Sequence, residues 1–469
     1  MTMILTIDSN ITIYNPSMEL RRWCKKELTV SNPDYSKKLR MGFWLGDTPQ
    51  YLAMYEIRGD SLVLPYGVLN QLPKKLIENA IWVSHFKEPT KVDYKADIPL
   101  YAYQEAAVDQ MLKAKHGILQ APAGSGKTQM GLAMVAKLGK RALWLCHTQD
   151  LLRQSRDRAS QYMNKKLFGT ITAGKVNLGR GITFATVQTM CKLDLAQYKD
   201  YWDVIITDEV HRVSGTPSAV TRYQKVLNSL SARNKYGLSA TVHRADDLIK
   251  TTYALVGKVE HVIPVEAVKS RIMNVSVQPL ATGIRLSREC LNTDGTICYA
   301  KMINYLTETE ERNEGIRRLL IENSKGHSTL VLSDRVKHLQ ALLNSLPETV
   351  RKKAVMIDGK MTSKKGKAKR QQAIEDMRTG EKKILFATYA LAKEGLDIPV
   401  LDRLIMATPQ KDYAVITQSL GRVARVAPGK KEPIAYDLVD DIRTLIKSYK
   451  KRLKTYQKIG SEVKEGREL

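Results

Sequence analysis

The sequence is poor in cysteine, and the few cysteines form no metal-binding or disulfide pattern. Five are scattered along 469 residues, and no two of them stand as a Cys-x-x-Cys pair. This spacing argues against a zinc ribbon and against a disulfide framework, and it indicates a chain that folds in a reducing compartment. The cysteines are Cys24, Cys146, Cys191, Cys290 and Cys298.

Long apolar runs are absent as well. No run approaches the roughly 20 apolar residues of a helix that spans a bilayer. The N-terminus lacks a basic region followed by an apolar core, which a secretory signal needs. We therefore expect a soluble, intracellular protein with no membrane partner.

Acidic residues are outnumbered by basic ones. The chain has 48 Asp and Glu against 75 Lys and Arg, a formal net charge of +27. This excess favours a polyanionic partner, because cations that neutralise phosphates release counterions. A basic surface that serves only solubility is the alternative. Hydrophobic residues make up 43%, an ordinary globular share, and the length suits two or three domains.

The apolar runs predict an N-terminal segment followed by two α/β lobes. From Leu100 onward, short apolar runs alternate with helical stretches, which is typical of βαβ units around a parallel sheet. The predicted strands are 117–120, 142–146, 182–185 and 204–207, then, after an irregular segment near 259–275, 329–332, 354–357, 383–387, 403–407 and 434–438. The fold class is therefore α/β, with two tandem doubly wound parallel-sheet lobes and a small mixed α/β N-terminal accessory domain. The predicted ranges are 1–98 for the accessory domain, 99–266 and 267–440 for the lobes, and 441–469 for a basic C-terminal helix.

The N-terminal segment combines cations with aromatic side chains. Trp23 and Tyr35 lie among basic residues, a composition suited to phosphate contacts together with base stacking. An amphipathic helix with a solvated basic face explains the same pattern. The cations are Arg21, Arg22, Lys25, Lys26, Lys37, Lys38 and Arg40.

A phosphate-binding loop is predicted between a strand-like run and a helical run. The residues that begin at Ala121 read Ala-Pro-Ala-Gly-Ser-Gly-Lys-Thr, with alanine in place of the first glycine of the general pattern. The glycines let backbone N–H groups curl around phosphates at a helix N-terminus, where the dipole is positive. We expect Lys127 to neutralise phosphate charge and Thr128 to ligate Mg²⁺, so that ATP and Mg²⁺ are the cofactors. The predicted nucleotide-binding residues of the loop are Ala123, Gly124, Ser125, Gly126, Lys127 and Thr128.

A second acidic element follows the predicted strand 204–207. Asp208 and Glu209 stand where that strand ends, at the edge of the sheet where doubly wound folds bind ligands. One carboxylate can hold the metal while its neighbour orients the attacking water. We assign the metal to Asp208 and the catalytic base to Glu209.

Taken with the next two residues, the segment 208–211 reads Asp-Glu-Val-His and resembles motif II of superfamily 2 helicases of the DExH type. Further motifs of that family follow in the expected order, from about residue 100 to residue 440. Their fixed order carries the resemblance, which implies that both lobes are RecA-like. The matching segments are 145–154 for motif Ia, 183–188 for motif Ib, 239–241 for motif III, 384–388 with 394–397 for motif V, and 418–425 for motif VI.

The resemblance implies roles around the nucleotide. Arg422 and Arg425 match the arginine fingers, which stabilise the transition state of phosphoryl transfer. His211 and Gln418 match residues that couple the nucleotide state to closure of the lobes. Gln104 resembles the glutamine that contacts adenine, with Tyr101 or Tyr103 stacking nearby, and Asp397 of motif V is assigned to the nucleotide as well.

It also implies contacts with a nucleic-acid backbone. Thr148, Thr186 and Thr388 lie where the family places such contacts, which suit phosphate oxygens because a hydroxyl donates without selecting a base. Packing at strand ends explains single threonines equally well. The Lys-rich tract 360–370 matches the place where the second lobe of related motors meets DNA, and a solvated loop is its alternative. The residues assigned in this tract are Lys364, Lys365 and Arg370.

The motif details favour the DNA-directed branch of the family. The Asp-Glu-Val-His motif, the His-Thr-Gln-Asp-Leu-Leu run and Gln418 differ from the DEAD-box RNA helicases, and the compact core is most similar to the phage UvsW-type helicases. This resemblance implies an ATPase that moves forks and Holliday junctions in the cytoplasm of a bacterial or phage-infected cell. Its expected partner is branched or forked DNA with double- and single-stranded parts.

Two other functions remain open at this point. A motor of a restriction-type nuclease needs a further metal site, and Pro33-Asp34 with Glu56-Ile-Arg58 matches a nuclease motif only loosely because the final lysine is missing. A DNA-binding scaffold with a decayed nucleotide site is the other candidate. The intact residues of the phosphate loop and of motifs II and VI oppose it.

Overall fold

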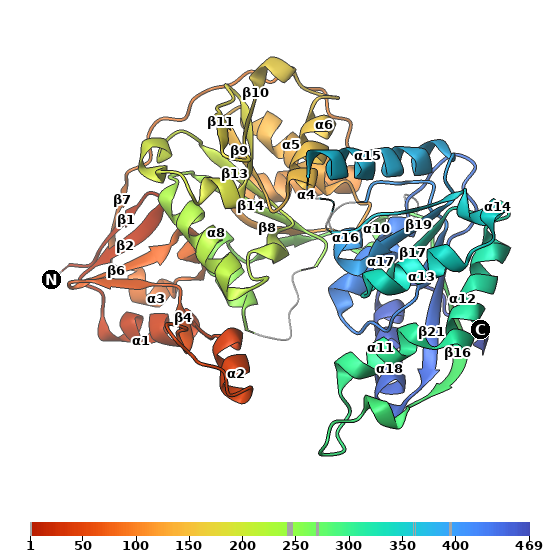
Figure 1. The fold of residues 1–469 in the computed structure, drawn as a ribbon. Helices are drawn as coiled ribbons and strands as arrows, with labels where there is room; N and C mark the ends of the chain where they lie inside the picture. Colours follow the sequence, from red (N-terminus) through yellow and green to blue (C-terminus); the bar gives the residue numbers. More distant parts are fainter. Residues whose placement is uncertain (1, 242–246, 269–271, 360, 362, 394–395) are drawn as a thin grey trace. The chain divides into compact units, whose positions relative to one another are not determined.

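The computed structural model describes residues 2–241, 247–268, 272–359, 361, 363–393 and 396–469. The chain divides into two compact units (Figure 1). The first comprises Met1–Pro122 and Gly126–Pro264, and the second comprises Ala123–Ser125 and Val265–Leu469. Glu394 and Gly395 of motif V, Lys360 of the Lys-rich tract and the side chain of Lys364 lie outside what the structure describes.

The first unit is built around an eight-stranded sheet with the strand order β11-β10-β12-β9-β13-β14-β8-β15. Every neighbouring pair is parallel except β10 and β11, which pair antiparallel. All residues of β9, β12, β13 and β14 are buried, as strands need to be in a parallel sheet that helices cover on both faces. The bounds are β8 His116–Gln120, β9 Ala142–Cys146, β10 Phe168–Thr172, β11 Lys175–Asn177, β12 Ile182–Thr186, β13 Val204–Asp208, β14 Asn234–Ser239 and β15 Val259–Val262.

The helices of this lobe begin and end at residues that suit helix termini. Thr216 caps α8 by accepting a hydrogen bond from the Ala219 N–H, and Pro217 occupies the first turn. Gly139 ends α5 with φ +57°, a left-handed conformation that glycine adopts without strain. The bounds are α4 Ala102–Ala114, α5 Lys127–Leu138, α6 Gln149–Ala159, η2 Lys165–Leu167, α7 Val187–Met190, η3 Leu195–Tyr198, η4 Val210–Arg212, α8 Pro217–Ser229 and α9 Ile249–Val256.

The N-terminal region forms its own five-stranded sheet, in the order β5-β6-β2-β1-β7, and a separate antiparallel pair of β3 and β4. In the five-stranded sheet only β1 and β7 pair in parallel. The bounds are β1 Ile4–Ile7, β2 Asn10–Tyr14, α1 Met18–Glu27, β3 Thr29–Ser31, α2 Pro33–Arg40, β4 Tyr51–Ala53, β5 Glu56–Arg58, β6 Ser61–Pro65, η1 Tyr66–Gln71, α3 Lys74–Ile77 and β7 Ile81–Ser84.

This region packs directly on the first lobe. The Tyr66 hydroxyl donates to the carbonyl of Arg233 at 3.0 Å, and the Asn10 amide donates to the carbonyl of Asn228 at 2.7 Å. The backbones approach so closely at Gly67 that a Cβ there would lie 2.6 Å from the carbonyl oxygen of Ala254. One continuous hydrophobic cluster spans both parts. The N-terminal region therefore shares a large hydrophobic contact with lobe 1. A separate accessory domain over residues 1–98 stays a prediction.

The second unit contains a seven-stranded, wholly parallel sheet in the order β18-β19-β17-β20-β21-β16-β22. The predicted α/β class with two tandem parallel sheets is thus confirmed. None of the described helices is long and apolar enough to cross a membrane. The bounds are α10 Val265–Val268, β16 Ser276–Arg285, η5 Arg288–Cys290, α11 Tyr299–Glu308, α12 Glu310–Asn323, β17 Thr329–Ser333, α13 Val336–Ser345, α14 Glu348–Arg351, β18 Ala354–Met356, α15 Lys364–Thr379, β19 Ile384–Thr388, α16 Tyr389–Lys393, β20 Arg403–Met406, α17 Tyr413–Val423, β21 Ile434–Asp441, α18 Arg443–Lys458 and β22 Arg467–Glu468.

Candidate functional site

Three neighbouring strands of lobe 1 end at one edge of the sheet and bring the predicted nucleotide residues together. β14 lies between β8 and β13, with Ser239 opposite Gln120 and Asp208 opposite Leu238. The phosphate loop follows β8, motif II follows β13 and motif III ends β14. Because parallel strands have their carboxyl ends at the same edge, segments far apart in the sequence meet there.

The phosphate loop has the backbone that its glycines predict. Gly124 and Gly126 have φ angles of +83° and +82°, and Gly126 caps the N-terminus of α5. A Cβ at Gly126 would overlap the Nε2 atom of Gln104, so only glycine fits. The Lys127 ammonium donates to the carbonyls of Ala121 and Pro122, both at 3.2 Å, at the start of the same loop. A helix N-terminus, an ammonium and curled N–H groups suit the phosphates of ATP.

Gln104 lies beside this loop. Its side chain is only 2% exposed, and its Oε1 accepts a hydrogen bond from the Tyr101 N–H at 2.9 Å, which caps α4. The rings of Tyr101 and Tyr103 stack with centroids 6.0 Å apart. The structure therefore places the glutamine predicted to contact adenine against the backbone of the phosphate loop. Its adenine contact stays a prediction.

Asp208 is a buried carboxylate next to the phosphate loop. It accepts hydrogen bonds from the Ser155 hydroxyl at 3.2 Å and from the Glu209 N–H at 3.0 Å. Burial raises its pKa to about 6, and the Glu209 charge adds to this rise, whereas the positive charge of Lys127 opposes it. Burial makes an uncompensated negative charge on this carboxylate unfavourable. A bound divalent cation would compensate that charge. Asp208 and Thr128 are the residues that would hold Mg²⁺.

Glu209 and His211 are connected to motif III. The His211 Nδ1 atom lies 3.2 Å from Glu209 Oε2 and 2.9 Å from the Ser239 hydroxyl. Because that hydroxyl donates to the carbonyl of Thr241 at 2.7 Å, it accepts from His211, which places a ring proton on Nδ1. The Glu209 carboxylate is thus linked through one histidine to the end of the neighbouring strand β14.

In lobe 2 the motif VI arginines contact the motif V segment. Arg422 lies on α17 and donates to the carbonyls of Ala392 at 2.8 Å and Leu396 at 3.1 Å. Arg425 forms an ion pair with Asp397. Gln418, on the same helix, is buried, with 8% of its surface exposed. Arg422 and Arg425 of motif VI therefore contact the motif V segment. Their catalytic and nucleotide-binding roles stay predictions.

Two positioning residues escaped the sequence analysis. Ser155, on α6, holds the Asp208 carboxylate, and Arg378, on α15, binds Asp397 through both its carbonyl at 2.7 Å and its carboxylate at 3.3 Å. Neither residue belongs to a recognised motif, although α6 begins within motif Ia. For Ser155, the signal that could have identified it was its position directly after motif Ia.

The predicted nucleic-acid contacts fall in different environments. Thr148 caps α6 by accepting from the Leu151 N–H at 3.3 Å, and the buried Thr186 donates to the Thr189 hydroxyl at 3.0 Å. Both hydroxyls thus have local structural partners. Thr388 ends β19 and is half-buried. In α15, Lys365 is exposed and Arg370 is half-buried.

Comparison with known proteins places both lobes in one family. Residues 97–244 match the model described as "Type III restriction enzyme, res subunit", and residues 311–427 match "Helicase conserved C-terminal domain". A putative ATP-dependent RNA helicase of Acanthamoeba polyphaga mimivirus is 28% identical over 86% of this chain and 81% of its own length. A probable helicase of Escherichia phage T5 is 26% identical over 96% and 94%. The DNA 3'-5' helicase XPB of Kineococcus radiotolerans is 25% identical over 70% and 57%.

Solved structures show the same fold. Saccharomyces cerevisiae Dbp5 bound to RNA and ADP BeF3 aligns with 78% of this chain and 89% of its own, at 18% identity and a TM-score of 0.55. The crystal structure of T4 UvsW aligns with 100% of this chain and 99% of its own, at 17% identity and a TM-score of 0.42. The Dbp5 alignment and the two family models together identify the two sheets as RecA-like lobes, as the sequence predicts.

Proposed function

Because the chain belongs to the superfamily 2 helicases, we propose that it is an ATP-driven DNA motor that remodels forks and four-way junctions. The family models and the helicase relatives support ATP-dependent helicase activity. The observation that carries the proposal is the meeting of Lys127, Asp208 and Glu209 at one edge of the lobe 1 sheet. Each of these side chains can perform one role in phosphoryl transfer.

The residues divide the work of hydrolysis among them. Lys127 would neutralise phosphate charge, and Asp208 with Thr128 would hold Mg²⁺, which would supply further positive charge against the charge that develops on the phosphates. Glu209 orients the attacking water. His211 contacts both Glu209 and Ser239, so a change at the nucleotide can shift motif III through this histidine. We place Arg422 and Arg425 as the charges that stabilise the transition state. Closure with ATP and opening after hydrolysis would then alternate the grip of the lobes on the strand.

DNA is the proposed track. Supporting it are the charge of +27 and the relatives named as DNA helicases, among them the XPB protein of Kineococcus radiotolerans. RNA is the competing track, because the mimivirus relative is named as a putative RNA helicase. Branched DNA as the preferred form rests on the likeness of the motifs to the phage branch-migration helicases.

Two assays test the proposal. ATPase rates are measured with single-stranded DNA, duplex, junction DNA and RNA, and we expect stimulation by DNA that exceeds stimulation by RNA. Strand displacement is then compared on forked, four-way and simply tailed DNA, with faster turnover expected on the first two. Equal activity on all three would contradict branch specificity, and equal or greater stimulation by RNA would contradict the DNA track.

A nuclease-linked motor is the second candidate, favoured by the restriction-enzyme model that matches lobe 1. Its loosely matching residues do not form a metal cluster in the structure: Glu56 and Arg58 pair with each other on β5 at 2.6 Å. Incubation of the protein with Mg²⁺ and supercoiled plasmid tests it, because nicked or linear product would support this candidate over a motor alone.

A further inference from the structure

The helix α2 and the loop after it expose apolar side chains in the N-terminal region. No residue of α2 is buried, although the helix is well formed from Pro33 to Arg40. Leu39 is 61% exposed, Phe43 59% and Trp44 87%. Large apolar side chains gathered on a surface mark an interaction site more often than scattered ones do. The cations Lys37, Lys38 and Arg40 lie among them.

This segment is nevertheless held in a fixed conformation. The Asn32 amide donates to the Pro49 carbonyl at 2.7 Å, and the Lys38 ammonium donates to the Thr48 hydroxyl at 2.7 Å. The ring of Trp44 lies over Gly46, where a Cβ would come within 2.9 Å of it. A surface that is ordered before binding loses little conformational entropy when a ligand docks.

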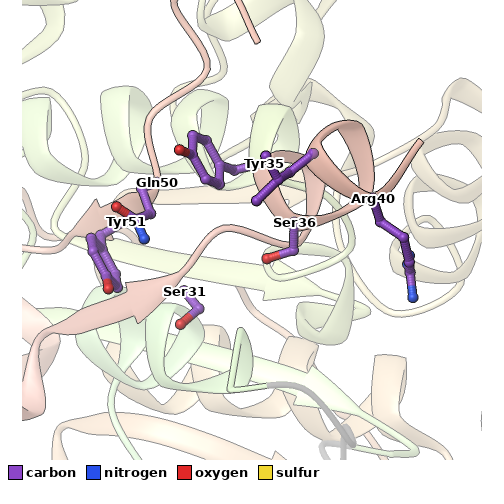
Figure 2. A pocket seen from close by; sticks show the side chains of 7 residues that line it. Ser31, Tyr35, Ser36, Arg40, Gln50 and Tyr51 are labelled. Atoms are coloured by element: carbon purple, nitrogen blue, oxygen red, sulfur yellow. The ribbon is translucent and has the colours of Figure 1, made fainter. Parts of the chain in front are cut away.

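A surface pocket of about 260 Å³ opens between α2 and β4. Figure 2 shows Tyr35 from α2 and Tyr51 from β4 on different borders of this pocket, with Gln50 beside Tyr51 and Arg40 further along the helix. Ser36 adds a hydroxyl to the lining. With Ser31 and Leu39, the lining comprises two aromatic rings, an amide, two serine hydroxyls, a guanidinium and one leucine side chain.

We propose that this pocket, here called the α2–β4 pocket, binds an unpaired nucleobase of a single DNA strand. Tyr35 and Tyr51 offer ring faces for stacking, which accepts any base because every base has a π-face. Gln50 and Ser36 can hydrogen-bond the base edge, and Arg40 with Lys37 faces the adjoining phosphates. The inference rests on the proposed function, since it takes a nucleic-acid motor as its premise.

The chemistry of the lining selects a single strand over the other occupants. A paired duplex keeps its base faces stacked inside, so it cannot fill a pocket that is bordered by aromatic rings. Leu39 also lines the pocket and would suit a protein partner, but the rings of Tyr35 and Tyr51 beside Arg40 favour a base with its phosphate. At a fork, the α2–β4 pocket would therefore hold a displaced strand while the two lobes act on the rest of the substrate.

Anisotropy titrations of the full-length protein with labelled strands test this assignment. The Tyr35→Leu/Tyr51→Leu variant keeps apolar bulk but removes both ring faces, and we expect it to bind an oligo-dT strand about tenfold more weakly. Its affinity for blunt duplex should stay within twofold of the wild type. Tyr14→Leu is the matched control, because Tyr14 is a similarly exposed tyrosine of the same region on β2.

An abasic strand distinguishes base stacking from phosphate binding. The wild type should bind it about as weakly as the Leu variant binds oligo-dT, because the phosphates remain but the bases are gone. Arg40→Gln changes an exposed side chain, so it should disturb folding less than the tyrosine substitutions do. It should weaken binding to the abasic strand and to oligo-dT alike. Wild-type affinity of the Tyr35→Leu/Tyr51→Leu variant for oligo-dT would overturn the inference.

Photocrosslinking gives a direct readout on the unmodified protein. A strand that carries 5-iododeoxyuridine should crosslink within residues 31–51, and crosslinks confined to other segments would overturn the inference.

Failure of the proposed function gives a result that differs from failure of this inference. If no nucleic acid stimulates the wild-type ATPase, the motor assignment fails, whereas stimulated ATPase with unchanged strand affinity in the tyrosine variant removes the α2–β4 pocket alone.

Discussion

Lys127 is the cation of the phosphate loop, and its ammonium donates to the carbonyls of Ala121 and Pro122 at the start of that loop. We expect Lys127→Ala to lower ATP hydrolysis about 100-fold or more, because it removes a charge that opposes phosphate repulsion in the transition state. DNA affinity without nucleotide should change less than threefold. Lys137→Ala is the control, since Lys137 lies on the same helix in an exposed ion pair with Asp109. Wild-type turnover by the Lys127 variant would refute the site.

Ser155 orients the carboxylate that we assign to the metal. Groups that hydrogen-bond a metal ligand typically contribute about 10- to 100-fold to metal affinity or activity. Ser155→Ala should therefore raise the Mg²⁺ concentration for half-maximal ATPase about tenfold, with most of the rate recovered at saturating Mg²⁺. Ser160→Ala, beyond the end of α6, serves as the control because its hydroxyl donates only to the nearby Asp157 carbonyl. An unchanged Mg²⁺ dependence would contradict this role.

Lys235 is a buried lysine where the N-terminal region meets lobe 1. It is 1% exposed, and its ammonium donates to the carbonyls of Leu227 at 2.7 Å and Ser9 at 3.2 Å. Burial lowers its pKa from 10.5 to about 7, while the distant charge of Asp8 opposes this shift. A charged lysine held there by neutral carbonyls is expensive to desolvate.

This burial makes stability depend on pH in a definite direction. Between pH 7 and pH 10.5 the unfolded chain binds more protons at Lys235 than the folded chain, so stability rises with pH by up to about 1.4 kcal/mol per unit. We expect the thermal midpoint of the wild type to rise relative to Lys235→Met between pH 7 and pH 9. Lys225→Met, on an exposed side chain of α8, should show no such difference. Parallel curves for the wild type and Lys235→Met would contradict the shifted pKa.

The residues of the site were predictable to the extent that motifs mark them. Asp208 ends a strand, and Lys127 and His211 stand in the segments that follow strands, so their positions in the sequence already imply a common sheet edge. Ser155 and Arg378 could not be predicted, because their positions depend on how a helix lies across the sheet. That geometry arises from packing between segments far apart in the chain.

At the scale of elements, most of the strands could be predicted because their side chains are apolar. Residues 142–146 form β9 as predicted, and the predicted strand 204–207 is extended by one residue in β13. β10, β14, β15 and β16 were missed. β14 begins with Asn234 and Lys235, which are buried on the side of lobe 1 that meets the N-terminal region, where carbonyls from other segments accept hydrogen bonds from both side chains. A sequence pattern cannot show partners of that kind.

The sequence predicts a basic helix over 441–469, but α18 spans only Arg443–Lys458, and Arg467–Glu468 form β22 beside β16. The structure also shows that α18 is part of the lobe 2 core. Arg452 is 2% exposed, and its Nε donates to the Asp437 carboxylate of β21 at 2.8 Å. The Tyr456 hydroxyl donates to the same carboxylate at 2.8 Å. The helix is therefore anchored by a buried ion pair as well as by its apolar face.

Removal of one partner should destabilise lobe 2 strongly. Arg452→Met leaves Asp437 buried without its counter-charge, and such a loss typically costs about 3 to 5 kcal/mol. We expect the lobe 2 transition in thermal unfolding to shift to lower temperature, and Asp437→Asn in the same chain to restore part of the loss. Lys451→Met changes an exposed neighbour on the same helix and should leave the transition in place. A small effect of Arg452→Met would mean that the apolar face alone holds α18.

For the whole molecule, the charge of +27 becomes informative only where it is concentrated. The first turns of α15 follow the Ser363 cap and carry exposed lysines on consecutive turns. These lysines do not stabilise the helix, because like charges four residues apart, as at Lys365 and Lys369, repel each other. A polyanion along this helix would offset the repulsion. The resemblance of the sequence to superfamily 2 helicases predicts a DNA contact at this position.

Neutralising these lysines separates a DNA contact from general basicity. In Lys365→Gln/Lys367→Gln/Lys369→Gln, each lost phosphate contact should flatten the plot of log affinity for duplex against log salt by about 0.9. The control neutralises exposed lysines of lobe 1 and its N-terminal region, at Lys74, Lys75 and Lys225. It removes the same net charge, so a general field effect would lower affinity equally in both variants. If α15 contacts phosphates, only the first variant loses slope, and an unchanged slope there would assign these lysines to solvent.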